Sequence, residues 1–287
     1  MLASLLAALT VIQTHVWIRQ GPVLAGSRVV WTSEGPAVYA SAPVRRLWRA
    51  GSADITDLAA SASRIAFIRH SDLWVGPPFH SIGAARSVDV VGKTVAYTQT
   101  VSGESRVVAE NATVATSGNA EYSDVAIAGH YVAWIERTGL ERWPAPPSRI
   151  VVYDVAAHHV AYALDVDELG HTVVSSLDVQ ADGTVAFASD PAPAGGCDGG
   201  VAWASIAQPR PHYLSGDAIP WRVRIAGGRI AYFTRTCPAP TPFRLVVKTL
   251  ADRTVADGVT IYGGFDLDGR RLAYLKSPKE IAVTRLR

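Results

Sequence analysis

A short phrase repeated seven times constrains the fold of this chain more than any other feature. Residues 266–274 read Asp-Leu-Asp-Gly-Arg-Arg-Leu-Ala-Tyr, which is a turn-forming pair, an apolar run, an alanine and an aromatic residue. Related phrases end at other aromatic residues, and the full set is Trp31, Phe67, Tyr97, Trp134, Phe187, Tyr232 and Tyr274. A spacing of about 40 residues with β-type patterning is typical of a β-propeller, with one four-stranded blade per repeat.

The segments between the repeats also read as strands and turns. Short β-branched and aromatic runs are separated by Gly, Pro, Asp and Ser, and no segment keeps a 3.6-residue apolar period. The phrase predicts the turn between the first two strands of a blade, followed by the second strand. We therefore predict an all-β, seven-bladed β-propeller, and a six-bladed ring with one degenerate repeat is the alternative.

The last repeat supplies only two further strands, near residues 271–276 and 280–286. Residues 14–19, Thr-His-Val-Trp-Ile-Arg, form an additional strand candidate before the first repeat. Pairing these two ends would complete the seventh blade and cover an exposed sheet edge. We therefore expect the ring to be closed by an N-terminal strand at residues 14–19.

The first twelve residues are apolar and uncharged. They are too few for a membrane-spanning helix, which needs about 20 residues. Their length fits the apolar region of a signal peptide, although a positive leader and a clear cleavage site are missing. An apolar arm that packs on the domain is the alternative. The predicted organisation is a signal-like segment at 1–12 and a single propeller domain at 13–287, in an extracytoplasmic location: periplasmic, secreted or associated with the cell envelope.

The charge balance argues against a nucleic-acid partner. The 287 residues carry 27 basic and 25 acidic side chains, a net charge of +2, with no basic block. Past the N-terminus no apolar run approaches membrane-spanning length, so no integral membrane span is predicted. Only four of the basic residues are lysines, and the chain is rich in Ala, Val and Gly, which suggests a bacterial origin.

Two copies of the phrase carry a family resemblance. Residues 182–187 (Asp-Gly-Thr-Val-Ala-Phe) and 268–274 (Asp-Gly-Arg-Arg-Leu-Ala-Tyr) resemble TolB-type, WD-like β-propeller repeats. The other copies replace Asp-Gly, and the Ser-Pro that usually precedes it in that family is absent. The resemblance implies a fold rather than an activity. Its members are binding platforms, envelope-complex subunits or domains beside a hydrolase, and residues 1–287 contain no α/β-hydrolase sequence.

The two cysteines, Cys197 and Cys237, follow the second strands of neighbouring blades in Pro- and Gly-rich connections. We expect them to form a disulfide, which closes a loop of about 40 residues and would contribute roughly 3–4 kcal/mol on chain-entropy grounds. Oxidised pairs persist outside the reducing cytosol. Two unpaired thiols are the alternative.

Long connections in blades 4, 5 and 6 are the predicted ligand- or partner-binding face. Aromatic and arginine side chains are common anchors of recognition, and functional residues concentrate on loops held by a rigid scaffold. The candidate residues are Arg142, Trp143, Asp165, Asp167, Glu168, His171, His212, Tyr213, Asp217 and Trp221. Solvated connectors stiffened by proline are the alternative interpretation. The carboxylates and imidazole in residues 165–171 suit a hard cation but lack EF-hand spacing, so we predict neither a metal site nor a cofactor.

An aspartate recurs in the first strand of five blades, at Asp57, Asp89, Asp124, Asp178 and Asp266, with Arg222 at the corresponding place in blade 6. These side chains would border the central channel. They could favour a cation or a polar ligand at its mouth. Alternatively, each short carboxylate accepts backbone N–H groups at a strand entry.

The chain contains no nucleophile elbow, Walker loop, zinc-protease motif or paired Cys-x-x-Cys, and no catalytic residue is assigned. We therefore predict a non-catalytic extracytoplasmic binding scaffold for a protein partner or a small polar ligand. The alternative is a propeller lyase or hydrolase with a polar or metal site at the channel mouth.

Overall fold

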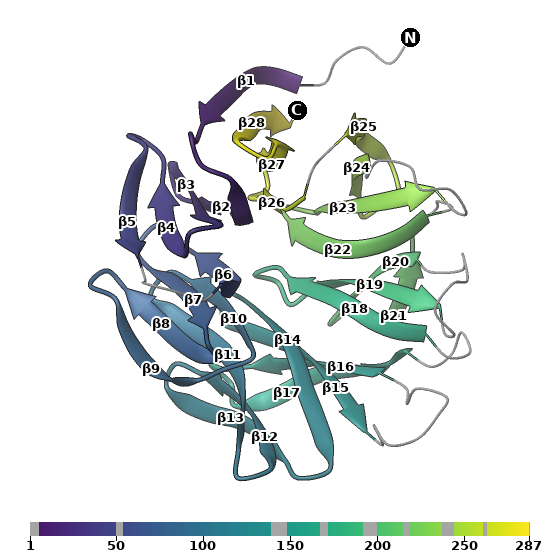
Figure 1. The fold of residues 1–287 in the computed structure, drawn as a ribbon. Coiled ribbons are helices and arrows are strands. Elements are labelled where there is room, and N and C mark those ends of the chain that lie inside the picture. Colours follow the sequence, from purple (N-terminus) through teal and green to yellow (C-terminus); the bar gives the residue numbers. More distant parts are fainter. Residues whose placement is uncertain are drawn as a thin grey trace.

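Seven four-stranded antiparallel sheets form a ring, with one edge strand of each sheet at the centre and the other three strands progressively further out (Figure 1). The computed structural model describes residues 6–49, 54–138, 148–166, 172–191, 200–214, 218–236, 244–260 and 263–286. This arrangement is the predicted seven-bladed β-propeller, and the six-bladed alternative is wrong.

The blades are numbered in chain order. Blade 1 contains β2 (Ile18–Ala25), β3 (Arg28–Ser33), β4 (Ala37–Ala40) and β5 (Arg45–Arg49). Blade 2 contains β6 (Ile55–Ala60), β7 (Ile65–Arg69), β8 (Asp72–Gly76) and β9 (His80–Ala84). Blade 3 contains β10 (Ser87–Val91), β11 (Thr94–Val101), β12 (Glu104–Ala109) and β13 (Ala112–Ser117).

Blade 4 contains β14 (Ala120–Ala128), β15 (Tyr131–Thr138), β16 (Ser148–Asp154) and β17 (His159–Asp165). Blade 5 contains β18 (Thr172–Val179), β19 (Val185–Pro191), β20 (Gly200–Ser205) and β21 (Gln208–Tyr213). Blade 6 contains β22 (Ala218–Ala226), β23 (Arg229–Thr236), β24 (Arg244–Thr249) and β25 (Thr254–Thr260). Blade 7 contains β26 (Phe265–Leu267), β27 (Arg271–Ser277), β28 (Glu280–Leu286) and β1 (Leu6–Gln13).

The repeated phrase forms the turn into the second strand of each blade, as predicted. Its alanine is fully buried in six blades, at Ala66, Ala96, Ala133, Ala186, Ala231 and Ala273 (each 0% exposed). Blade 1 has Val30 at this place, 1% exposed. The aromatic that follows packs into the seam with a neighbouring blade; Trp31, Phe67 and Phe187 are 0% exposed. The phrase is therefore a packing unit that repeats because the seams repeat.

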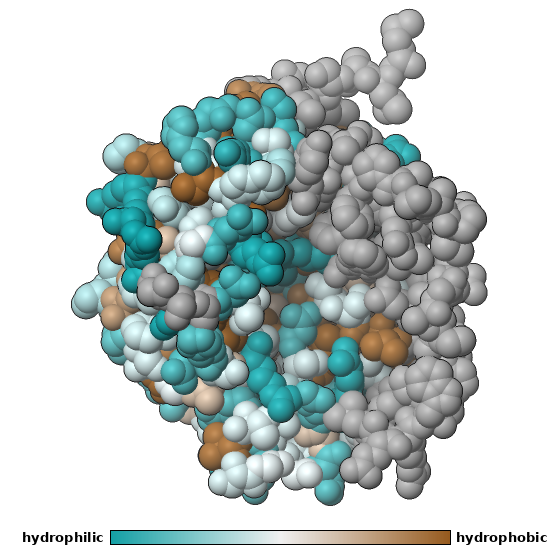
Figure 2. Space-filling view, viewed as in Figure 1, coloured by the Kyte–Doolittle hydropathy of each residue, from teal (hydrophilic) through white to brown (hydrophobic). Residues whose placement is uncertain are grey.

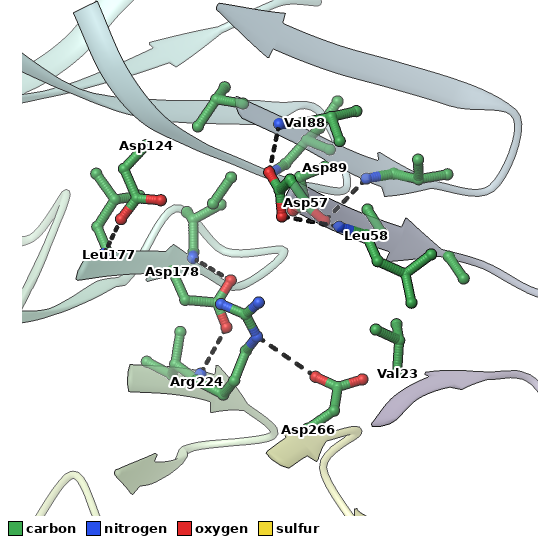
Figure 3. A pocket seen from close by; sticks show the side chains of 18 of the residues that line it. Val23, Asp57, Leu58, Val88, Asp89, Asp124, Leu177, Asp178, Arg224 and Asp266 are labelled. Atoms are coloured by element: carbon green, nitrogen blue, oxygen red, sulfur yellow. Dashed lines mark hydrogen bonds and ion pairs between the residues drawn. The ribbon is translucent and has the colours of Figure 1, made fainter. Parts of the chain in front are cut away.

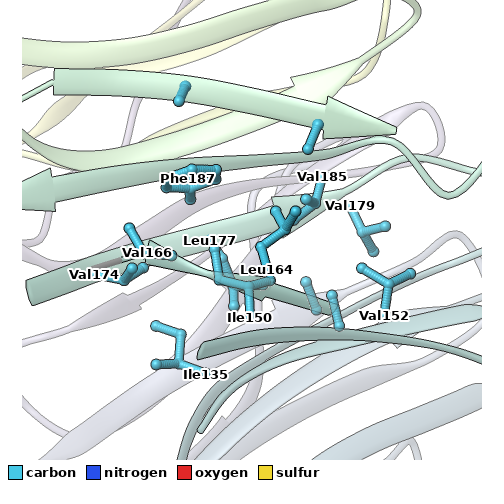
Figure 4. Close-up of a cluster of buried hydrophobic side chains, with 14 of the residues drawn as sticks. Ile135, Ile150, Val152, Leu164, Val166, Val174, Leu177, Val179, Val185 and Phe187 are labelled. Carbon is cyan, nitrogen blue, oxygen red and sulfur yellow. The ribbon is translucent and has the colours of Figure 1, made fainter. Parts of the chain in front are cut away.

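One cluster of buried apolar side chains occupies each seam of the ring. The cluster between blades 4 and 5 contains Ile150 and Leu164 on one side and Leu177 and Phe187 on the other (Figure 4). Burying a side chain of this size contributes about 1.5–3 kcal/mol. The cluster between blades 7 and 1, which includes Trp31 and Ile281, closes the circle of packing contacts.

The closing strand is β1, not the predicted residues 14–19. It pairs with β28 in antiparallel register from Leu6 opposite Leu286 to Gln13 opposite Glu280. Ile18 and Arg19 instead begin β2, because blade 1 needs an inner strand that can bury Val23 and Leu24. Most of the segment expected to be signal-like therefore lies in β1.

Removing residues 1–13 would leave the outer edge of β28 unpaired and would uncover the seam that Ile12 helps to cover. We expect this truncation to lower the melting temperature by several degrees, since the loss of a few kcal/mol shifts a domain of this size by about 2–4 °C per kcal/mol. Differential scanning calorimetry measures the change.

Removal of residues 1–5 is the matched control, because it leaves β1 intact. Equal melting temperatures for the two truncated chains would show that β1 does not close the ring.

Candidate functional site

The inner strands surround a central cavity of about 200 Å³ that is lined mainly by polar groups (Figure 3). Figure 2 shows that the face seen in Figure 1 is hollowed near its centre. The charged residues that line the cavity are Asp57, Asp89, Asp124, Asp178, Asp266 and Arg224. They alternate along the inner strands with the apolar residues that pack into the seams, as the two faces of a strand require.

Each inner strand is the edge of its blade, so some of its backbone N–H groups find no partner within the sheet. At the seams between blades 2 and 3, 3 and 4, 4 and 5, 5 and 6, and 7 and 1, side chains of the preceding blade accept some of these groups. A first tier has Val88 N to Asp57 Oδ2 (2.9 Å), Val125 N to Ser87 Oγ (3.1 Å), Leu177 N to Asp124 Oδ2 (3.0 Å) and Val223 N to Ser176 Oγ (3.4 Å). Blades 2 to 6 are thus joined in sequence by main-chain to side-chain hydrogen bonds as well as by apolar packing.

A second tier lies two residues further along the inner strands. It has Ile127 N to Asp89 Oδ2 (2.8 Å), Ile225 N to Asp178 Oδ2 (2.8 Å) and Leu24 N to Asp266 Oδ2 (2.7 Å). The last of these bonds joins blade 7 to blade 1. The recurring aspartate therefore has the structural role that was one of the two predicted alternatives, and it also borders the channel.

The seam between blades 7 and 1 lacks a first-tier bond for a structural reason. Pro22 occupies the donor place, two residues before Leu24, and proline has no N–H to satisfy. Gly264 occupies the acceptor place, directly before Phe265, and has no side chain. A Cβ on Gly264 would overlap the carbonyl oxygen of Gly21. This seam therefore lacks both the N–H donor and the side-chain acceptor of the first tier, and the backbones at Gly21 and Gly264 approach closely.

Blade 6 contributes arginines where other blades contribute acceptors. Arg222 and Arg224 lie opposite Phe233 and Ala231 of β23, so they fall in the first and second tiers respectively. Arg224 Nε lies 3.5 Å from Asp266 Oδ1 (Figure 3). Sequence reasoning identified Arg222 but missed Arg224, although the repeated two-residue spacing of the tiers predicts both.

Five carboxylates face two guanidinium groups, so the channel has an excess of three negative charges when all are ionised. Burial raises the pKa of every one of the five aspartates, while backbone N–H groups and Arg224 oppose the rise at all five. Arg222 also opposes it at Asp57, Asp124 and Asp266. The pKa of Asp124 rises to about 6, and that of Asp178 to about 7. Burial lowers the pKa of Arg222 to about 10, whereas the aspartates around Arg224 raise its pKa.

Asp124 reaches its place through a β-bulge. The register of β14 shifts between Ser123 and Val125, which makes Asp124 the extra residue, and its φ is +48°. The bulge allows the carboxylate to accept the N–H of Leu177 in the next blade.

Three of the predicted loop-face residues lie on outer strands. Asp165, at the end of β17, has an 82% exposed side chain, and its Oδ1 lies 3.7 Å from Arg149 Nε. His212, in β21, stacks on Trp203 with ring centroids 4.5 Å apart. Tyr213 follows it and is 42% exposed.

The side chains of the other predicted loop-face residues are not described by the structure. Trp221 belongs to β22, but its side chain is not among those described. The residues outside the described ranges are Arg142, Trp143, Asp167, Glu168, His171 and Asp217, together with the predicted disulfide partners Cys197 and Cys237. Within the described ranges, no three His, Cys, Asp or Glu side chains are grouped so as to hold a metal ion. No helix in the same ranges is long and apolar enough to cross a membrane.

Comparisons with known proteins support the fold alone. No protein-family model matches the chain, and no curated protein matches it. Among solved structures, the WD40 β-propeller domain of Doa1 is 11% identical, with a TM-score of 0.60 over 95% of this chain and 96% of that one. KlAtg21 in complex with the coiled-coil of AgAtg16 is 12% identical, with a TM-score of 0.61 over 91% of each chain.

A structure from a study of two prolyl endopeptidases is 13% identical, with a TM-score of 0.63. The matched region is 93% of this chain and 45% of that chain. Together the comparisons show a WD40-like β-propeller fold.

The raised aspartate pKa values predict how stability depends on pH. Between its ordinary pKa of 3.8 and its raised pKa of about 7, Asp178 binds more protons in the folded protein than in the unfolded chain. Its contribution to the free energy of unfolding therefore falls as the pH rises through this range. Asp178→Asn removes the titration but keeps a side-chain oxygen for Ile225 N–H, so we expect a smaller fall with pH than in the wild type.

Urea unfolding at a series of pH values measures both slopes. Asp165→Asn is the control, since this exposed carboxylate lies outside the channel and the variant should follow the wild type. A wild-type slope retained in Asp178→Asn would contradict the assignment.

Proposed function

We propose that this protein is a non-catalytic, extracytoplasmic binding scaffold that recognises a protein partner or a small polar ligand through the connections of blades 4 to 6. The observation that carries the proposal is the use of the channel carboxylates. All five accept backbone N–H groups of the next blade, so the inner polar residues are engaged in holding the ring together. Recognition then belongs to the residues in which the blades differ.

The blades differ most in the connection between their second and third strands. Blades 2, 3 and 7 make it with residues 70–71, 102–103 and 278–279. Blades 4, 5 and 6 make it with residues 139–147, 192–199 and 237–243. These three long connections occur in consecutive blades, which favours one continuous recognition surface on a rigid scaffold.

The register of blade 4 supports a shared side for its connections. Arg137 in the second strand pairs with Ser148 in the third, and Arg149 in the third pairs with Asp165 in the fourth. The second and fourth strands therefore end on the same side of the ring, so the connections that follow them leave the blade on that side. A protein partner is the favoured occupant because the similar propeller KlAtg21 is seen in complex with a coiled-coil.

A propeller lyase or hydrolase with a polar or metal site at the channel mouth is the second candidate. It is favoured by the raised pKa of Asp178, since a carboxyl group that titrates near neutral pH can serve as a general acid or base. The scaffold proposal predicts that Asp178→Asn leaves partner capture unchanged.

The loop face is tested by a Trp143→Ala variant, because a central aromatic anchor commonly contributes 2 kcal/mol or more to binding. We expect at least about a tenfold loss of affinity for partners captured by the wild-type protein from envelope extract and then purified. Surface plasmon resonance measures the affinity of each captured partner.

Trp17→Ala is the matched control, because Trp17 is 51% exposed and lies beside Lys279 of blade 7. Undiminished binding by the Trp143→Ala protein, with the same melting temperature as the wild type, would remove this face from consideration.

The extracytoplasmic location is tested through Cys197 and Cys237. We expect both thiols to be inaccessible to an alkylating reagent in protein trapped directly from cells, and to become accessible after reduction, because a disulfide persists only outside a reducing compartment. Mass spectrometry counts the alkylated cysteines. A Cys197→Ser variant, which leaves Cys237 without a partner, calibrates the free thiol. Two alkylated cysteines without reduction would contradict this location.

A further inference from the structure

A basic cavity of about 590 Å³ lies on the opposite side of the ring from the long connections, between the first turns of blades 6 and 7. Its lining residues are Gly227, Arg229, Asp268, Gly269, Arg270, Arg271 and Arg285. Four guanidinium groups thus surround a space in which Asp268 is the one lining carboxylate. A volume of 300–1,000 Å³ is typical of pockets that bind small molecules.

The fixed geometry of two of these arginines argues for a formed site. Arg271 Nε donates to Asp268 Oδ2 (2.8 Å), and Arg271 Nη2 donates to the carbonyl oxygen of Gly26 in blade 1. Arg229 Nη1 donates to the carbonyl oxygen of Gly269 (3.0 Å). These bonds hold guanidinium groups from blades 6 and 7 in place before any ligand arrives, which lowers the entropy cost of binding.

Among the described residues, no carboxylate compensates the charge of the other two arginines. Arg285 lies directly opposite Arg271 in the pairing of β28 with β27, and like charges in that relation destabilise a sheet. Arg270 and Arg285 are both exposed, and neither pairs with a carboxylate in the part of the chain that the structure describes. An anion in the cavity would relieve this repulsion.

A second cavity, of about 450 Å³, adjoins the first and shares Arg271 and Arg285 with it. It lies between blades 7 and 1, and its lining includes Ile12 of β1, Val29 of β3 and Val283 of β28. The rest of its lining is Thr10, Ser27, Ser41, Ala42 and Thr284, and the exposed surface of the cavity is mostly apolar. The two cavities together present a cluster of arginines next to a mostly apolar space. A ligand that fills both must have an anionic head and an apolar tail.

We propose that this pair of cavities binds a small soluble amphiphile that carries a phosphate monoester head and an alkyl tail. The planar guanidinium groups of Arg270, Arg271 and Arg285 suit the oxygens of a phosphate, which they can contact in pairs. The tail lies against Ile12 and Val283. The site is remote from the loop face and does not depend on the function proposed for it.

Isothermal titration calorimetry of the full chain with a soluble alkyl phosphate, below its micelle concentration, tests the proposal. We expect binding that is at least about tenfold tighter than that of inorganic phosphate, because the buried tail adds apolar contact. An alkyl glucoside with the same chain should not bind measurably. Equal affinities for alkyl phosphate and inorganic phosphate, or binding of the glucoside, would overturn the proposal.

Two variants separate the head site from the tail site. Arg270→Gln combined with Arg285→Gln removes two exposed charges and should weaken the alkyl phosphate at least about tenfold, while Arg149→Gln on blade 4 should have no effect. Ser27→Phe places a ring in the second cavity, where Ser27 is an exposed lining residue. It should lower the affinity for the alkyl phosphate to that for inorganic phosphate.

Unchanged affinity in the arginine double variant, with the melting temperature of the wild type, would overturn the head site. Binding to anionic phospholipid vesicles without binding of the free amphiphile would assign the arginines to a membrane surface and would also overturn the proposal.

Discussion

Hydrogen bonds from the inner-strand backbone to side chains of the preceding blade are the interaction on which this ring depends. Each inner strand has one sheet neighbour, so its other edge faces the channel, where an N–H group without a partner costs about 1–3 kcal/mol. A short carboxylate reaches across the gap between blades, as Asp89 does to Ile127. The same bonds fix the spacing of the blades, which apolar packing alone would specify less sharply.

The carboxylate acceptors concentrate negative charge at the centre of the ring, and the two arginines of blade 6 offset part of it. Five carboxylates around a cavity of about 200 Å³ repel one another, and Arg222 and Arg224 supply positive charge that opposes this repulsion. Burial, with a smaller contribution from neighbouring carboxylates, still raises the pKa values of Asp124 and Asp178. The seam between blades 7 and 1 reduces the charge in another way, because Gly264 and Pro22 require no carboxylate.

The sequence predicted the parts of the fold that repeat and missed those that depend on one place in the ring. The phrase ending in an aromatic residue located the second strand of every blade because each alanine and aromatic meets the same packing. The closing strand was misplaced because an apolar strand at a sheet edge and an apolar export segment have the same composition. The cavity around Arg285 was missed because its members come from distant segments, and only the ring brings β23, β27 and β28 together. Arg224 was missed for another reason, because only the register of the strands shows that acceptors recur in two tiers.

The division between shared and variable residues explains how one ring can present two unlike surfaces. The central positions are occupied by interblade hydrogen bonds, so any change there affects stability first. The connections between strands do not make these bonds, and in blades 4 to 6 the connection between the second and third strands is long. On the other side the turns stay short, and Gly227 lies so near Gly269 that an added Cβ would be 3.0 Å from the Cα of Gly269. Chemical variety on that side must therefore come from the side chains beside the turns, and the arginines of blades 6 and 7 supply it.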